Sequence, residues 1–136
     1  MGIVIYLFFN GNAEEAMNFY AQATGGSILN INRYGDNGMA CAESEKGKVM
    51  HGIITVNGSQ MMFSDCGEKK KAVFGDNFSV SVDYKNEDDM RKAFEGLVQG
   101  GTVVMPLQDT FWGATFGMLT DKFGVNWMFN HDKPKA

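Results

Sequence analysis

The amino-acid sequence predicts an α+β protein of two tandem βαβββ modules, whose strands form a curved mixed sheet around a cavity. Two asparagines that fit helix N-caps, Asn12 and Asn86, lie 74 positions apart, and two glycine pairs that fit helix stops, beginning at Gly25 and Gly100, lie 75 apart. The same order of strand, helix and hairpin surrounds each pair, which indicates an internal repeat. A module of about 60 residues buries little core by itself. We therefore expect the two modules to pack together around one core.

The first module spans residues 1–66 and begins with a strand over Ile3–Phe9. This segment is a continuous apolar run, typical of a strand that is buried on both faces. Asn12, with Glu15 three residues later, resembles a capping box. Apolar residues then recur at helical spacing until the stop at Gly25.

Extended segments follow the first helix. The pattern predicts them over Ser27–Tyr34, Met39–Glu43, Val49–Val56 and Gln60–Ser64. The last two flank Asn57-Gly58, which is the strongest short signal for a β-hairpin.

A linker is predicted over residues 67–76, and its Lys69–Lys71 run favours a solvated segment, with an anion-binding patch as the alternative. The second module spans 77–136. Its helix starts at Asn86 and ends at Gly100, and its polar C-terminal tail contains His131. We expect its strands over Phe78–Asp83, Thr102–Leu107, Thr115–Thr120 and Val125–Asn130.

Composition excludes several classes of protein. The net charge is −4, which gives no electrostatic attraction to nucleic acid or to an anionic membrane. Cys41 and Cys66 lie 25 positions apart without a C-x-x-C spacing, so we expect two reduced, packed cysteines, although a disulfide stays open. The N-terminus carries no basic region or cleavage site, and we expect a cytoplasmic protein.

Three segments carry a resemblance to a known family: "NGNAEEAMNFY", "VMHGIITVNGSQMMFSD" and "DTFWGATFGMLTDKFGVNWMFN". With the paired modules, they resemble the vicinal oxygen chelate superfamily, which includes glyoxalase I, bleomycin-resistance proteins and extradiol dioxygenases. Within it the chain is similar to the PhnB-like branch, often labelled 3-demethylubiquinone-9 3-methyltransferase. The residues do not support that label, because both glycine pairs follow helices, whereas the glycine turn that cradles S-adenosylmethionine follows a strand.

The resemblance also implies where a metal would bind. Metal-dependent relatives place one ligand on the first strand and one on the last strand of each module. Alignment on "MNFY" puts these positions at Ile5, Met61 or Met62, Asn77 and Met128. Only Asn77 and the adjacent Asp76 offer oxygen to a hard cation, and a thioether is a poor ligand for one. We therefore predict no metal and no cofactor.

The same positions suggest a pocket for a flat apolar or aromatic molecule, with a few polar groups to orient it. The alternative is a filled core, which is the usual role of such side chains. His51 is the first candidate for a polar group that faces the cavity or a dimer contact. The full candidate set is Ile5, Leu7, His51, Met61, Phe63, Asn77, Ser79, Asp109, Trp112 and Met128.

Three classes of function follow. The first, which we favour, is metal-independent binding of a small apolar or aromatic molecule by a homodimer. The second is an enzyme that uses acid–base residues such as His51 with Asp65 or Asp109. The third is a lyase or oxygenase with a non-standard metal site. No catalytic residue can be assigned from the sequence.

Overall fold

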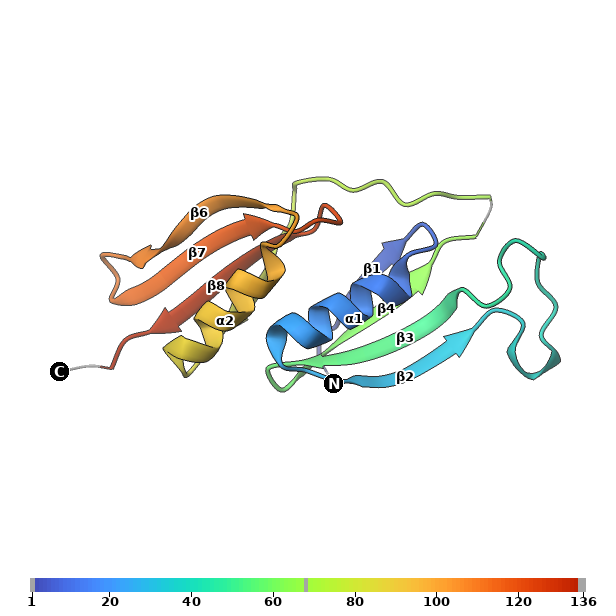
Figure 1. Cartoon of the computed structure of the whole chain (residues 1–136), viewed down its shortest axis with the longest axis horizontal. Coiled ribbons are helices and arrows are strands. Elements are labelled where there is room, and N and C mark those ends of the chain that lie inside the picture. The colour runs from blue at the N-terminus through green and yellow to red at the C-terminus, as the bar shows by residue number, and fades with distance from the viewer. Residues whose placement is uncertain (1, 68, 135–136) are drawn as a thin grey trace. The chain divides into compact units, whose positions relative to one another are not determined.

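A computed structural model describes residues 2–67 and 69–134 (Figure 1). The outer ends of the two predicted modules, and residue 68 of the predicted linker, lie outside the described residues. The contacts divide the chain into two compact units. The main division falls between Val73 and Phe74, and the short segment Ala23–Gly25 groups with the second unit. None of the described helices is long and apolar enough to cross a membrane.

The first unit is one four-stranded sheet with a helix on one face. The sheet has the order β1-β4-β3-β2, in which β1 and β4 are parallel and the other pairs antiparallel. Its elements are β1 (Ile5–Phe9), α1 (Ala13–Thr24), β2 (Ile28–Arg33), the 3-10 turn η1 (Asp36–Gly38), β3 (Val49–Val56) and β4 (Ser59–Asp65).

The core of this unit lies between α1 and the sheet. Tyr20 of α1 packs against Phe63 of β4, with ring centroids 5.8 Å apart, and Phe63 stacks on Phe9 at 5.9 Å. All three side chains are fully buried. A glycine at position 52 of β3 makes room for the helix, because a Cβ there would meet Sδ of Met17 at 2.6 Å.

Strand β1 corrects one expectation. It begins at Ile5 rather than Ile3, and it is not buried on both faces. Leu7 and Phe9 are buried, whereas Tyr6 and Phe8 are 38% and 53% exposed. A continuous apolar run predicts burial on both sides, but α1 covers only one side of this strand within its unit.

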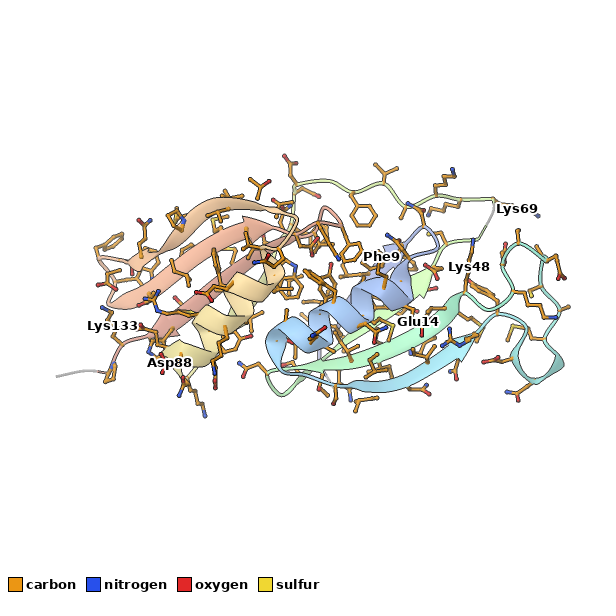
Figure 2. The ribbon with its side chains drawn as sticks, viewed as in Figure 1. Phe9, Glu14, Lys48, Lys69, Asp88 and Lys133 are labelled. Carbon is orange, nitrogen blue, oxygen red and sulfur yellow. The ribbon has the colours of Figure 1, made fainter. Side chains whose placement is uncertain are left out.

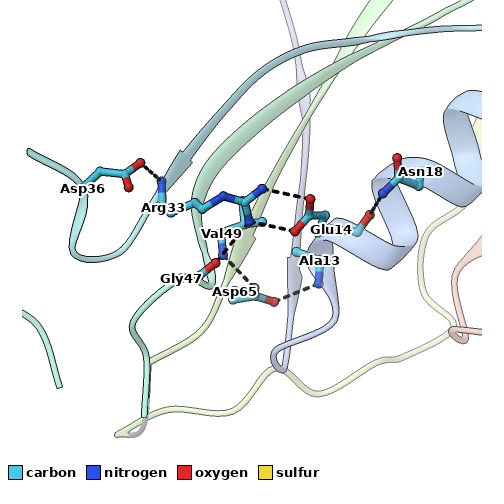
Figure 3. Close-up of polar contacts among 8 residues, drawn as sticks. All are labelled: Ala13, Glu14, Asn18, Arg33, Asp36, Gly47, Val49 and Asp65. Carbon is cyan, nitrogen blue, oxygen red and sulfur yellow. Dashed lines mark hydrogen bonds and ion pairs between the residues drawn. The ribbon is translucent and has the colours of Figure 1, made fainter. Parts of the chain in front are cut away.

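Residues 39–43 do not form the predicted strand. They belong to the connection from β2 to β3, where Gly35, Gly38 and Gly47 have positive φ angles of 88°, 75° and 85°. Such backbone bends interrupt the pairing of a strand. Arg33 anchors the connection, since its guanidinium donates to both carboxylate oxygens of Glu14 at 2.7 and 2.9 Å and to the carbonyl of Gly47 at 3.2 Å (Figure 3).

A buried carboxylate joins the ends of three elements. Asp65 Oδ1 accepts a hydrogen bond from the backbone N–H of Ala13 at 2.9 Å, and its Oδ2 accepts one from Val49 at 3.0 Å (Figure 3). Oδ1 also accepts a hydrogen bond from the N–H of Gly11 at 2.9 Å. The residue is 2% exposed. It therefore fixes the start of α1, the start of β3 and the end of β4 together, and a carboxylate at a helix N-terminus is electrostatically favourable.

The second unit repeats the arrangement. Its sheet has the order β5-β8-β7-β6, with β5 and β8 parallel. The elements are β5 (Val80–Asp83), α2 (Glu87–Leu97), β6 (Thr102–Asp109), β7 (Ala114–Thr120) and β8 (Asn126–Asp132). The predicted α+β class and the two βαβββ modules are thus confirmed.

The predicted start of α2 is also confirmed, and the helix ends at Leu97, with Val98 as its C-cap, shortly before the predicted stop at Gly100. Asn86 Oδ1 accepts a hydrogen bond from the N–H of Asp89 at 3.0 Å, which is an N-cap. Asp88, in the first turn, is exposed (Figure 2). Gly100 has a φ of 75°, and Gly25 takes the same conformation, φ 74°, after α1. Both glycine pairs therefore end helices.

Trp127 and Phe129 of β8 form the core of the second unit with Phe94 of α2. Phe129 meets Phe94 edge to face at 5.7 Å and stacks on Trp127 at 6.1 Å. The indole Nε1 of Trp127 donates to Oδ2 of the buried Asp121 at 2.9 Å. Two backbone N–H groups bind Oδ1 of the same carboxylate and close the β7–β8 turn.

His131 corrects the expectation of a polar tail. It lies in β8, opposite Thr115 of β7, and is 8% exposed. Its Nδ1 lies 2.9 Å from the carbonyl oxygen of Tyr84. The strand continues past Asn130 because β7 is long enough to pair with it, which the polar composition of residues 130–133 concealed.

Candidate functional site

The two faces of the first sheet differ in what covers them. Because side chains alternate along a strand, the neighbours of the buried Leu7, Phe9 and Phe63 point away from α1. We call the surface that they form the helix-free face of the first sheet; it consists of Tyr6, Phe8, His51, Ile53, Met62 and Ser64. This face carries aromatic rings, one thioether and few polar groups.

A hydrogen-bonded pair lies in the middle of this face. Tyr6 Oη is 3.0 Å from Nδ1 of His51, and the two rings are tilted with centroids 5.7 Å apart. The pair joins β1 to β3 across β4, which lies between them. In the strand register, Tyr6 of β1 pairs with Met62 of β4. Gly52 of β3 pairs with Phe63 of β4, so the next position along places His51 opposite Ser64. Ser64 also pairs with Phe8, so the Tyr6 and His51 side chains meet diagonally across β4.

The pair can hold protons in two ways. When His51 is neutral, the phenol donates to Nδ1, so the imidazole proton sits on Nε2. When His51 is protonated, Nδ1 donates to the phenol oxygen and both Nε2–H and the phenol O–H become donors. Within the described residues, Nε2 has no hydrogen-bond partner. In either state the face therefore presents at least one N–H or O–H donor.

Phe8 lies beside this pair and adds an aromatic surface. Its ring stacks on that of Tyr6 with centroids 5.0 Å apart and planes inclined by 27°. Met62, on the neighbouring strand, is partly exposed. Stacked rings beside a flexible thioether suit a flat apolar molecule.

The second sheet has a corresponding helix-free face, formed by Ser81, Phe116, Met118, Met128 and Asn130. Trp112, in the β6–β7 loop as predicted, meets Phe116 edge to face at 5.7 Å and is 53% exposed. Phe111, beside it, is almost fully exposed. Met128, a predicted site residue, lies opposite Met118 and Ser81.

The candidate site residues fall into separate groups. Leu7, Met61 and Phe63 are buried on the α1 side of the first sheet, and Ile5 lies on that side too. Asn77 is exposed in the segment before β5, and Ser79 is half-buried there. His51 is on the helix-free face of the first sheet, with two residues that the sequence analysis did not select, Tyr6 and Phe8. A period of two along β1 would have identified them, but its unbroken apolar run hid that period.

Asp109 lies at the end of β6 and is held by an ion pair. Lys133 Nζ, just after β8, is 2.7 Å from its Oδ1, and the hydroxyl of Thr115 donates to the same oxygen at 3.3 Å. The hydrogen bond from Lys133 lowers the pKa of Asp109. This carboxylate is therefore anionic at neutral pH, which disfavours it as a proton donor.

The fold raises the question of a metal centre. Across residues 2–67 and 69–134, no three His, Cys, Asp or Glu side chains gather in a way that could hold an ion. On the helix-free face of the first sheet, β1 carries the phenol of Tyr6 and the phenyl ring of Phe8. On the same face, β4 carries the thioether of Met62 and the hydroxyl of Ser64. These side chains do not fit a divalent cation, which needs several carboxylate or imidazole ligands.

Comparison with known proteins places this architecture in one fold class. A glyoxalase/bleomycin resistance protein/dioxygenase family enzyme from Burkholderia phytofirmans has the same fold, with a TM-score of 0.63 and 15% identity over 96% of this chain and 97% of its own. The paired βαβββ modules of this chain therefore have the glyoxalase/bleomycin resistance fold.

More similar proteins define the family. The family model described as 3-demethylubiquinone-9 3-methyltransferase matches residues 1–129. Protein PA1353 from Pseudomonas aeruginosa is 36% identical, with a TM-score of 0.87 over 98% of this chain and 99% of its own. A putative 3-demethylubiquinone-9 3-methyltransferase, PhnB protein, from Bacillus cereus is 34% identical, with a TM-score of 0.78 over 96% and 99%. Protein YjdN from Escherichia coli is 30% identical over 92% of this chain and 91% of its own. The chain belongs to this family.

Proposed function

We propose that the protein binds a small apolar or aromatic molecule without a metal ion, and that the helix-free face of the first sheet holds it. The observation that carries the proposal is the Tyr6–His51 hydrogen bond of 3.0 Å, set among exposed aromatic and thioether side chains. An apolar surface with a few oriented polar groups is the usual form of a small-molecule site.

The side chains around the pair support a planar ligand. Phe8 and Tyr6 are stacked, so a third ring laid against them extends the stack. Met62 can adjust its shape to different ring sizes, which favours breadth of binding over strict selection. Trp112 and Phe116 offer a second aromatic surface in the second unit.

Methyl transfer, which the family description names, is not part of the proposal. A turn that holds S-adenosylmethionine runs from a strand through glycines into a helix. Gly25 and Gly100 instead follow helices, with φ angles of 74° and 75°. They serve as C-terminal stops.

Binding of aromatic probes to a matched pair of variants tests the proposal. Phe8→Ala removes a 53% exposed ring beside Tyr6, and Leu29→Ala removes a 52% exposed side chain from β2 at the opposite edge of the same sheet. We expect Phe8→Ala to weaken 2-naphthol binding by about tenfold, in line with the loss of one aromatic contact. Leu29→Ala should bind as the wild type does. Equal affinities in both variants and the wild type would contradict the proposed location.

An enzyme that moves a proton is the second candidate. The Tyr6–His51 pair favours it because the phenol oxygen can take a substrate proton while the phenol gives its own proton to Nδ1 of His51. A substrate with an acidic C–H or O–H next to its ring would be required. Exchange of such protons with deuterium oxide, catalysed by the wild type and not by His51→Gln, would support this candidate.

We also propose that the chain forms a homodimer. Strand β6 lies at the edge of its sheet and pairs only with β7, and its Val103 and Val104 are 44% and 58% exposed. An edge strand with exposed apolar side chains is prone to pair with another chain. Light scattering should give twice the monomer mass, whereas a monomer at all concentrations would contradict the proposal.

A further inference from the structure

The donors of Tyr6 and His51 point to a narrower class of ligand than apolar or aromatic molecules in general. We propose that these two residues make the helix-free face of the first sheet selective for aromatic molecules that carry an anionic oxygen, such as a carboxylate. This inference rests on the proposed function, because it assumes that an aromatic ring binds there.

The first argument is the chemistry of the pair. In a neutral His51, Nδ1 accepts a hydrogen bond from the phenol O–H, so the face offers one donor, Nε2–H. A protonated His51 donates from Nδ1 to the phenol, which releases the phenol O–H as a second donor. A phenol O–H donor beside a positive charge suits a carboxylate oxygen, and hydrogen bonds that involve a charged group are about twice as strong as neutral ones.

The second argument is the charge around the pair. The backbone neighbours of His51 on β2 and β4 are Asn32 and Ser64, and neither side chain titrates. Tyr6 is the titratable group that faces it from β1. Among the described residues of this face there is no carboxylate, so nothing there neutralises an imidazolium or repels an anionic ligand.

The third argument is the position of the aromatic rings. Phe8 stacks on Tyr6 with centroids 5.0 Å apart, which places an apolar ring next to the phenol oxygen. A benzoate-like molecule can therefore lay its ring beside Phe8 and extend its carboxylate toward Tyr6 and His51. A purely apolar ring would leave these donors without an acceptor, which costs binding energy once water is excluded.

The test compares three probes of similar size: benzoate, benzamide and toluene. Affinities are measured by NMR titration between about pH 5.5 and 8, the interval in which histidine changes charge. We expect benzoate to bind most tightly at the lower pH and to lose about threefold to tenfold in affinity as the pH rises. Benzamide and toluene, which are uncharged, should show no such change.

Three variants locate the effect. Tyr6→Phe keeps the ring and removes one donor, so benzoate should bind about threefold to tenfold more weakly while toluene is unaffected. His51→Gln should abolish the pH dependence of benzoate binding. Gln60→Ala, an exposed residue farther along β4, is the control and should behave as the wild type.

The outcomes separate the two proposals. If benzamide and toluene bind but benzoate has no advantage at low pH, the inference is wrong and the proposed function stands. If benzoate retains its pH dependence in His51→Gln, the inference is also wrong. If none of the three probes binds at millimolar concentration, both proposals fall.

Discussion

The phenol oxygen of Tyr6 lies 3.0 Å from Nδ1 of His51, although 45 positions separate the two residues and β4 lies between their strands. Ser64 of β4 lies opposite His51 and pairs with Phe8, so Tyr6 and His51 meet diagonally across β4. Neither residue is adjacent to the other by backbone pairing. The polar centre of this face therefore joins two strands that do not pair with each other.

A larger side chain at Ser64 should separate the pair. We expect Ser64→Leu to break the Tyr6–His51 hydrogen bond, because leucine occupies the space over which the rings approach each other. The nitrogen-15 shifts of His51 report the change, since Nδ1 would lose its donor and the neutral ring would become a mixture of tautomers. Gln60→Leu, on the same strand and face, is the control. Unchanged His51 shifts in Ser64→Leu would show that the pair does not depend on this space.

The Asp65 carboxylate should be a major source of stability in the first unit. Its two oxygens accept three backbone hydrogen bonds, from Gly11, Ala13 and Val49. In Asp65→Asn, the amide NH₂ faces at least one backbone N–H. Because both groups are donors, at least one buried hydrogen bond is lost, and we expect the free energy of unfolding to fall by about 3 kcal/mol. Urea denaturation measures it.

Asp36→Asn is the matched control for that change. Asp36 is exposed and its carboxylate accepts one bond, from the N–H of Arg33 at 2.7 Å. Its substitution should cost less than about 1 kcal/mol. Similar losses in the two variants would contradict the role assigned to the buried carboxylate.

Tyr84 should destabilise the protein at alkaline pH. Its hydroxyl is buried and has no hydrogen-bond partner among the described residues, and burial, with the nearby Asp89, raises its pKa to about 12. The unfolded phenol ionises near pH 10. Stability from this difference is complete below about pH 10 and is lost as the pH rises through about 12, by about 2 kcal/mol.

Two phenylalanine variants check this account of Tyr84. Tyr84→Phe should be as stable as the wild type at neutral pH and should lose less stability above about pH 10, because no buried hydroxyl remains to ionise. Tyr34→Phe removes a hydroxyl that donates to the carbonyl of Asp65 at 3.0 Å, so it should cost about 1 kcal/mol at neutral pH. A loss as large in Tyr84→Phe would mean that its hydroxyl is hydrogen-bonded.

Removal of divalent metals should leave the protein unchanged. The side chains that β1 and β4 carry on the helix-free face of the first sheet do not fit a divalent cation. We therefore expect the same melting temperature with and without EDTA. Elemental analysis of the purified protein is the accompanying measurement. A stoichiometric transition metal whose removal lowers the melting temperature would contradict the prediction.

The sequence was informative where a local signal determines the structure. Asn86 was identified as an N-cap and Gly25 and Gly100 as helix stops, because capping depends on residues within one turn. Asn57 and Gly58, with φ angles of 49° and 85°, form the predicted hairpin turn. These signals were enough to find the repeat.

The sequence was less informative where distant segments decide the outcome. The apolar run around Tyr6 and Phe8 does not reveal that α1 covers only one face. The polar residues near His131 do not reveal that β7 extends to pair with them. The partner of His51 lies two strands away, so neither periodicity nor motif could indicate it. The candidate residues on β1 and β4 were therefore chosen from the helix side of the sheet.

Intermolecular NOEs between benzoate and the EDTA-treated protein at about pH 6 test the central claim most directly. The account predicts NOEs from the ligand ring to the side chains of Phe8 and Tyr6 and to the imidazole of His51. Binding that gives NOEs only to other parts of the protein, or that requires an added metal ion, would contradict it.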